Sequence, residues 1–572
     1  MYHYSIFSRF TMLTVLIVLL STLTLKSYGQ PINDADSVQL SFNINGFSIS
    51  AVLQKNVQLL EKISTPFEEN EQLHYKGQLS GYPNSSIRVS YNHDHWQGVL
   101  LFDGALYIVD SSHKAMTSVA GGLRTYLAEK DKKTQICASG SIKNTLPKND
   151  DSIAFSQADT ANADNNQSSH NFIVSYLTSA SASLADVCAN RINGVCLLPK
   201  IELAYDLSYQ ELPGSESPMQ RALRELNEME LFFQNGLGYQ FSQFDIIMLS
   251  EEQDELIGSS DDPNDLLDRL RKLRSSNRLD FLKQRESIFH LVTGRDFSEA
   301  ESNVKGIAYL GTVCAADGSN TGLSKADDSS LVSLVMAHEI GHNLGAEHDS
   351  LETNGCPDNQ NVMSANLNLQ SSRFDGFSSC SIEAINQNVA NNLSGACFKF
   401  PVDIGITASP DNPVSPDLET PFDLVYDINT DDGFIPIGSL NVRGEISNTD
   451  EGQFVSASIE GSVCTSMASS YNCTVNNPLR DFSLKVTATV NQNAAELSMR
   501  HWVSTAIEYT EDVISSNDEL NVTLNNFYEP SPTVDSIDEE PRPNNSGGGG
   551  GSIHPLGLVL LGGFYVFRRF KK

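Results

Sequence analysis

A run of twelve residues, HEIGHNLGAEHD, begins at His338 and holds three histidines, a glutamate and a glycine at fixed spacing. On a helix, residues i and i+4 share a face, so His338 and His342 can direct their imidazoles at one point. Glycine adopts positive φ easily, so Gly345 can end the helix and let His348 return to that point. Three imidazoles leave the fourth position of a zinc ion open for water, as in catalytic zinc sites.

Glu339 follows the first histidine, and its carboxylate can reach a metal-bound water rather than the metal. A bound zinc ion lowers the pKa of that water and polarises a substrate carbonyl. Glu339 would accept the proton of the water as general base and then deliver it to the leaving amine. The sequence therefore predicts hydrolysis with one catalytic Zn²⁺ and no organic cofactor.

Alternating strands and helices surround this run and must position it. Such alternation predicts a largely parallel sheet with helices packed against it. Helices follow from apolar residues at helical spacing, and strands from short apolar runs. The expected strands are 171–177, 201–205, 244–249, 288–293 and 306–313, the expected helices are 218–236 and 264–274, and the histidine helix starts near Asp328 or Ser329.

The full pattern H-E-x-x-H-x-x-G-x-x-H resembles that of the metzincin metalloproteases. The aspartate directly after the third histidine, Asp349, resembles the pattern of the reprolysin (adamalysin, ADAM-type) branch. The segments HLVTGRDF from His290, GIAYLGTVC from Gly306 and FSSCS from Phe377 resemble the same family. The resemblance implies an α/β metzincin catalytic domain over residues 171–400 and a zinc metalloendopeptidase that cleaves proteins or peptides.

The resemblance also implies roles for residues outside the histidine run. Met363, in Val362-Met363-Ser364, would form the methionine turn beneath the zinc ion. An edge strand would bind an extended substrate by β-augmentation. Its residues would be Ile307, Ala308, Tyr309 and Leu310, and the implied disulfides are Cys314–Cys397 and Cys356–Cys380.

A calcium ion stays an open alternative. The family's calcium site has an asparagine where this chain has Phe400 and an acidic residue where it has Ser287, with Glu286 beside it. Glu202 still matches one ligand of that site.

Nine cysteines in an exported chain should mostly pair. Spacing pairs Cys188 with Cys196 and Cys464 with Cys473, which leaves Cys137 without a partner. A thiolate is a strong zinc ligand, and a propeptide cysteine silences the zymogen in the reprolysin family. We predict that Cys137 is a latency switch, although the usual glycine after the cysteine is replaced by Ala138.

A chain of 572 residues is too long for a single hydrophobic core, and the sequence divides it into several segments. Arg9 and the apolar stretch after it predict a signal peptide, with an uncleaved anchor as the alternative. The segment HYKGQLSGYPNSSIRVS, from His74, resembles a reprolysin propeptide. The predicted order is signal peptide 1–29, β-rich propeptide 30–137, linker 138–170, protease domain 171–400, immunoglobulin-like β-sandwich 401–527, Pro/Gly-rich linker 528–552 and apolar helix with a basic end 553–572.

The last segment resembles the bacterial GlyGly-CTERM sorting signal, with glycines 547–551, an apolar stretch and a basic end. This resemblance implies a Gram-negative host, a rhomboid-type sorting protease, and location at the cell surface or outside the cell. A plain C-terminal membrane anchor is the alternative. The net charge of −33 argues against nucleic acid as a partner.

A second class of function is a surface adhesion protein that acts through its β-sandwich and carries a vestigial protease domain. The three histidines and three further motif residues are all present, which argues against a vestigial protease domain; the three are Glu339, Gly345 and Met363. The role of the β-sandwich stays open between a spacer and a substrate-binding unit.

Overall fold

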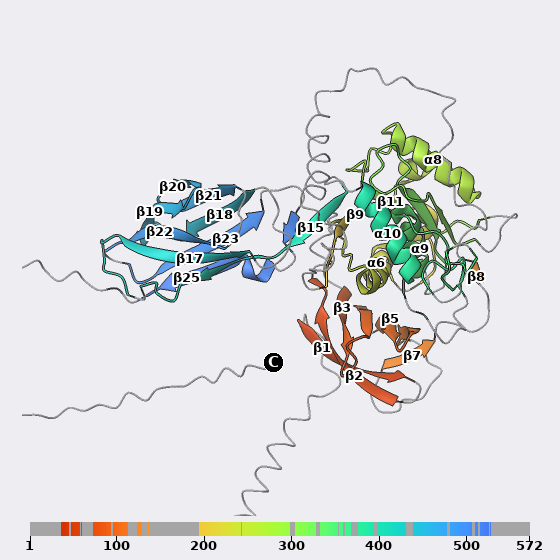
Figure 1. Ribbon diagram of the computed structural model, residues 1–572, viewed down its shortest axis with the longest axis horizontal. Coiled ribbons are helices and arrows are strands. Elements are labelled where there is room, and N and C mark those ends of the chain that lie inside the picture. Colours follow the sequence, from red (N-terminus) through yellow and green to blue (C-terminus); the bar gives the residue numbers. More distant parts are fainter. Residues whose placement is uncertain are drawn as a thin grey trace, which may run out of the picture.

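The computed structural model consists of a β-barrel, an α/β unit and a β-sandwich (Figure 1). It describes residues 36–44, 47–57, 59, 72–92, 95–111, 123–127, 134–135, 194–214, 216–241, 243–297, 304–327, 332–352, 354–357, 361–367, 374, 376–392, 397–413, 415–430, 439–476, 481–492, 494–505, 510–512, 515–525 and 527. The predicted signal peptide, the linkers, the C-terminal helix and the strand at 171–177 lie outside these residues, as do Cys137 and Cys188.

The N-terminal unit is a closed barrel of seven strands. Neighbouring strands are antiparallel, and β1 closes the barrel by pairing in parallel with β7. Closure leaves no open sheet edge. The strands are β1 (Ser37–Ile44), β2 (Phe47–Lys55), β3 (Gln72–Leu79), β4 (Ser86–Asn92), β5 (His95–Phe102), β6 (Ala105–Asp110) and β7 (Leu123–Leu127).

The α/β unit is built on a seven-stranded sheet of order β12-β13-β11-β9-β15-β24, with β10 also paired to β9. Strand β9 is parallel to β10 and β11, and β11 is parallel to β13. All residues of β9 are buried, as expected for a strand covered on both faces. The strands are β9 (Leu198–Tyr205), β10 (Gln243–Met248), β11 (Ile288–Thr293), β12 (Gly306–Ala308), β13 (Thr321–Lys325), β15 (Phe398–Val402) and β24 (Thr510–Asp512).

Helices cover both faces of this sheet. Leu203 and Tyr205 of β9 join the core formed by helices α6, α9 and α10, whereas Ala204 joins the core formed with α8. A capping box of Ser217 and Gln220 begins α6, which therefore starts where the sequence predicts. The helices are α5 (Leu207–Gln210), α6 (Pro218–Gly236), α7 (Glu251–Ile257), α8 (Pro263–Ser275), α9 (Val332–Leu344) and α10 (Ser379–Asn392).

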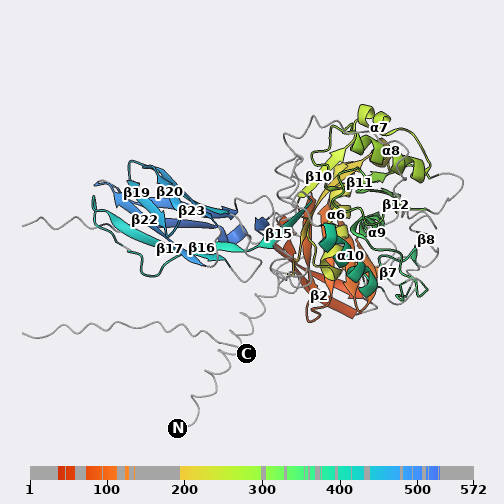
Figure 2. The same cartoon turned by 45° about the horizontal axis from the view of Figure 1, so that its top comes forward.

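The C-terminal unit consists of two antiparallel sheets, β16-β17-β22-β19 and β20-β21-β18-β23-β25, that enclose one apolar core. Figure 2 shows this unit beside β15, the strand through which the chain enters it. The strands are β16 (Ile404–Ala408), β17 (Phe422–Thr430), β18 (Ser439–Ile446), β19 (Gly452–Ile459), β20 (Val463–Ser466), β21 (Ser470–Asn476), β22 (Phe482–Val490), β23 (Leu497–Thr505) and β25 (Glu519–Leu524), with a 3-10 helix, η2, at Ser515–Asn517.

Two expectations from the sequence need correction. The strand predicted at 306–313 ends at Ala308, because the chain turns at Leu310 and Gly311 has a φ of +68°. The predicted boundary between residues 400 and 401 falls inside β15, which pairs with β9 and also with β24 from the following unit. Within the described ranges, no helix is both long enough and apolar enough to cross a bilayer.

Candidate metal centre

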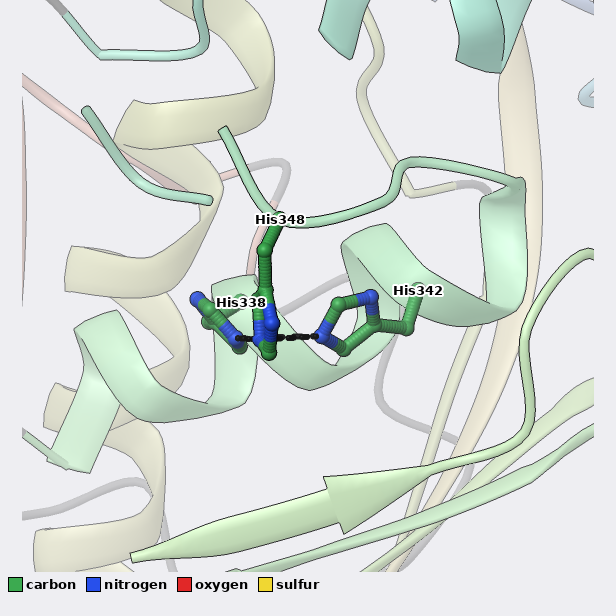
Figure 3. A group of neighbouring side chains, drawn as sticks. All are labelled: His338, His342 and His348. Atoms are coloured by element: carbon green, nitrogen blue, oxygen red, sulfur yellow. Dashed lines mark hydrogen bonds between the residues drawn. The ribbon is translucent and has the colours of Figure 1, made fainter. Parts of the chain in front are cut away.

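Helix α9 and the turn after it bring three imidazoles to one point (Figure 3). The Nε2 atoms of His338 and His342 are 3.1 Å apart, and each is 3.2 Å from Nε2 of His348. A zinc ion with bonds of about 2.0–2.1 Å in tetrahedral geometry needs ligand nitrogens about 3.3 Å apart. These three histidines are the candidate metal-ligand group found among the described residues.

The other ring nitrogens explain why a cation fits here. Nδ1 of His338 lies 2.7 Å from the carbonyl oxygen of Val362, and Nδ1 of His342 lies 2.6 Å from that of Ala346. Each Nδ1 must therefore carry the proton, since a carbonyl only accepts. Both Nε2 atoms then present lone pairs that repel at 3.1 Å unless a metal ion lies between them.

Burial keeps these imidazoles neutral. Desolvation, together with the neighbouring rings, lowers the pKa of His338 well below its ordinary value and that of His342 to about 3. Desolvation lowers the pKa of His348 to about 4. Neutral imidazole is the form that binds a metal, so the site is prepared for its ligand role near pH 7.

Glu339 lies beside the edge strand of the sheet. Its side chain is fully buried on α9. A Cβ placed on Gly306 of β12 would lie 2.6 Å from its Cγ and Oε1 atoms. The carboxylate of Glu339 therefore occupies space that any other residue at position 306 would take.

The turn after α9 brings His348 back toward the other two histidines and is formed at Gly345, as the sequence predicts. Gly345 has a φ of +115°, which favours glycine. Its N–H donates to the carbonyl of His342 at 2.9 Å, and the N–H of Ala346 donates to that of Gly341 at 2.9 Å. Asn354 then donates its side-chain amide to the carbonyl of His348 at 3.2 Å.

Met363 packs directly under the helix that carries the ligands. Its Sδ lies 2.6 Å from where a Cβ on Gly341 would stand, so the close packing requires glycine there. Met363 is fully buried and its carbonyl accepts the N–H of Asp349 at 3.0 Å. This arrangement fits a packing role beneath the histidines.

Asp349 does more than mark the motif. Its Oδ1 accepts hydrogen bonds from Ser378 at 2.6 Å and from Ser381 at 3.0 Å. Burial raises the pKa of its carboxyl, and the serine hydroxyls oppose that shift. Asp349 thus joins the third ligand, the Met363 turn and the start of α10. Its place after the third histidine was the sequence signal, but its partners were not predictable.

The edge strand is shorter than predicted but firmly held. Ile307 and Ala308 belong to β12, which pairs with β13 on one side and has no strand partner on the other among the described residues. Tyr309 donates its hydroxyl to Asp268 at 2.5 Å, and its carbonyl accepts the amide of Asn343 at 2.9 Å. The open side of β12 can therefore receive a peptide strand.

Cysteine pairs brace this region. The disulfides Cys314–Cys397 and Cys356–Cys380 lie in it, and a third, Cys464–Cys473, joins β20 and β21 of the C-terminal sandwich. Cys196 is also disulfide-bonded, and its expected partner Cys188 lies outside the described residues.

The residues at the expected calcium position do not fit a calcium ion. The carboxylate of Glu202 accepts the N–H groups of Lys283 and Gln284 at 2.6 and 3.1 Å and the hydroxyl of Ser287 at 2.7 Å. Burial raises the pKa of the Glu202 carboxyl and lowers that of the buried Arg274 guanidinium to about 10, and the charge of each group opposes the shift of the other. Phe400 supplies no side-chain oxygen, and the Glu202 carboxylate is already fully engaged in these hydrogen bonds.

Comparison with known proteins agrees with this geometry. Residues 245–401 match the Reprolysin (M12B) family zinc metalloprotease. The chain is 35% identical over 101 residues to the zinc metalloproteinase-disintegrin-like BmMP of Bungarus multicinctus and 36% identical over 100 residues to BfMP of Bungarus fasciatus. These alignments cover 18% and 17% of this chain and 16% of each relative, so the chain spans about a sixth of their length. Residues 245–401 are therefore similar to a reprolysin-type zinc metalloprotease domain.

Solved structures add little. A cohesin module from Clostridium perfringens ATCC13124 aligns with a TM-score of 0.19 and 11% identity over 22% of this chain and 99% of that chain. The CARDB domain of the PF1109 protein from Pyrococcus furiosus aligns with a TM-score of 0.16 and 15% identity over 22% of this chain and 94% of that chain. At such scores the likeness carries no weight for the fold or function of this chain.

Proposed function

We propose that this protein is a zinc metalloendopeptidase made as a zymogen. The observation that carries the proposal is the group of three converging Nε2 atoms, each 3.1 or 3.2 Å from the next, beside the buried carboxylate of Glu339. Three neutral nitrogen ligands leave one zinc position for water, which is the arrangement of a hydrolase.

The residues would divide the reaction among them. A zinc ion held by His338, His342 and His348 would supply an acidic water and a polarising charge. Glu339 accepts a proton from the attacking water and delivers it to the leaving amine. The unpaired side of β12 binds the extended peptide through its main chain, which aligns the scissile bond with the histidines.

Latency is supported by two contacts from the predicted propeptide. Strand β8 (Thr134–Gln135) pairs antiparallel with β14 (Asn366–Leu367), three residues after Met363. The N–H of Phe374 donates to the carbonyl of Gly104 in the barrel. In the sequence Cys137 follows β8 by two residues, and it lies outside the described residues.

The barrel also packs on helix α6 through buried polar pairs. Asn56 donates to the side chain of Asn227 at 3.0 Å, and Asn227 donates to the carbonyl of Val89 at 3.3 Å. Arg88 donates to Gln234. These bonds would hold the barrel and the β8 segment against the protease unit until the linker is cut.

Export completes the proposal and rests on the sequence alone. The signal peptide, the paired cysteines and the GlyGly-CTERM-like end favour a product at the cell surface or outside a Gram-negative cell, with at least transient membrane contact through the last segment. The seven segments predicted from the sequence are part of this proposal, with one change: the protease and sandwich units share the β15 region.

The test uses the exported, processed protein with a peptide library. Wild type should cleave peptides and Glu339→Gln should not, while both retain about one zinc ion per chain. Equal effects of both proteins on target cells, without cleavage, would instead favour adhesion through the sandwich. Cys137→Ala should make the unprocessed protein active; an inert Cys137→Ala proform would count against the thiol switch.

A further inference from the structure

Asn388 lies on helix α10 at a point where two turns near the histidines and the edge strand meet. One segment is the turn at Gly345, which follows the zinc-binding helix and leads to His348. The other is the turn at Gly311, which follows the edge strand β12. The two turns also touch each other, because the N–H of Gly311 donates to the carbonyl of His342 at 2.8 Å.

Asn388 completes the end of helix α9. The last carbonyls of a helix lack partners within the helix and need donors from elsewhere. The side-chain amide of Asn388 donates to the carbonyl of Leu344, the last residue of α9, at 3.0 Å. This bond lies two residues beyond His342 and four before His348, so it fixes the segment between two metal ligands.

The two glycines lie at different distances from this side chain. A Cβ on Gly345 would lie 2.5 Å from Cβ and 2.9 Å from Cγ of Asn388, so this turn is in close contact with Asn388. A Cβ on Gly311 would lie 3.4 Å from its Oδ1, which is an ordinary contact distance, so this turn lies beside Asn388 without crowding it. Asn388 therefore limits how closely the Gly345 turn approaches α10, and the bond from Gly311 to His342 joins the edge-strand turn to the same place.

Helix α10 is itself anchored, so Asn388 has a fixed base. Ile385 and Val389 are fully buried in the core. Cys380 is bonded to Cys356, and Asn392 donates to the carbonyl of Asn388 at 2.8 Å. A contact to Asn388 is thus a contact to a rigid element.

We propose that Asn388 is a positioning residue that holds the third zinc ligand and the substrate-binding edge in register. It touches neither metal nor substrate and acts through Leu344, Gly345 and Gly311. The inference rests on the proposed function for its substrate part, while its metal part concerns zinc retention alone.

Asn388→Asp is the sharpest test, because it keeps the size and turns the N–H donor that faces the Leu344 carbonyl into an acceptor. It also places a negative charge at a helix C-terminus, which is unfavourable. Asn391→Asp is the matched control, since Asn391 is exposed on the same helix. Asn388→Ala, which removes the donor without adding charge, is the second variant.

The measurements are zinc release to a chelator, kcat and KM on the processed full-length chain, and the melting temperature. We expect zinc release to become about tenfold faster in Asn388→Asp and about fivefold faster in Asn388→Ala, with KM raised as well. Asn391→Asp should match wild type in zinc release and KM, whereas its charge in the last turn of α10 can lower the melting temperature.

Two outcomes would overturn the inference. One is zinc release and KM in both Asn388 variants equal to those of Asn391→Asp. The other is a lower melting temperature with unchanged zinc release and KM, which indicates a merely structural residue. Faster zinc release in a protein whose wild type cleaves no peptide would support the positioning of the metal ligand and refute the proposed protease.

Discussion

Gly306→Ala adds one methyl group next to the proposed general base. The methyl would lie 2.6 Å from Cγ and Oε1 of Glu339 and 2.8 Å from its Cδ. Non-bonded heavy atoms prefer about 3.5–4.0 Å, so one group must move by about 1 Å. The backbone of Gly306 is held by its pairing with Ser324, and hence the carboxylate must move.

The displacement predicts a defined loss of activity. A misplacement of about 1 Å can cost about 100-fold in rate, or about 2.7 kcal/mol of barrier height. The three atoms nearest to this methyl all belong to Glu339 and none to a histidine, so we expect zinc content to stay unchanged. We therefore expect kcat for a peptide substrate to fall about 100-fold, with KM little changed.

Gly322→Ala is the matched control on the neighbouring strand. Its methyl would lie 3.0 Å from Nδ1 of His290, 3.1 Å from Cβ of Ala308 and 3.3 Å from Oδ1 of Asn343, so none of its three nearest atoms belongs to Glu339. Both variants overpack the same sheet and should lose similar stability, about 1–3 kcal/mol. A Gly306→Ala enzyme that is folded, holds zinc and has the kcat of Gly322→Ala would refute the reasoning.

Three further predictions follow from the same structure. A zinc chelator should abolish cleavage, and Zn²⁺ but not Ca²⁺ should restore it. Replacing Cys314 and Cys397 with serine should lower stability by about 4 kcal/mol in urea unfolding, because the bond closes a loop with a separation of 83 residues. Burial lowers the pKa of His501 to about 3, so below about pH 6.5 the unfolded chain binds a proton that the folded sandwich does not, and the sandwich loses stability as pH falls. The variant His501→Phe should flatten this dependence by up to about 1.4 kcal/mol per pH unit. The stability can be followed by the fluorescence of Trp502 in a Trp96→Phe background.

Local periodicity explains why part of the structure was predictable. His338 and His342 share a helix face by spacing alone, and strand 288–293 is a short apolar run that occupies the same residues in the structure. The N-terminus of α6 was predictable because Ser217 and Pro218 are local signals.

Contacts between distant segments explain the rest. Strand β13 has the sequence TGLSK, whose polar residues are buried by pairing with β11 and β12 rather than by their own character. Asn388 and Gly306 acquire their importance from Leu344 and Glu339, which lie 44 and 33 residues away in the chain. The periodicity of a sequence gives no information about such contacts, because the two partners do not belong to the same helix or strand.

The junction between the protease and sandwich units favours a stabilising role for the sandwich. Strand β15 follows Cys397 directly and pairs with both β9 and β24. Lys399 forms an ion pair with Glu511 at 2.9 Å, and the N–H of Ile404 donates to Asp512 at 2.8 Å. A freely tethered unit would leave the outer edge of β15 unpaired, and an unpaired edge is open to association with other chains. The sandwich therefore protects one edge of the sheet, while the opposite edge, β12, is the one that the proposed function leaves open for substrate.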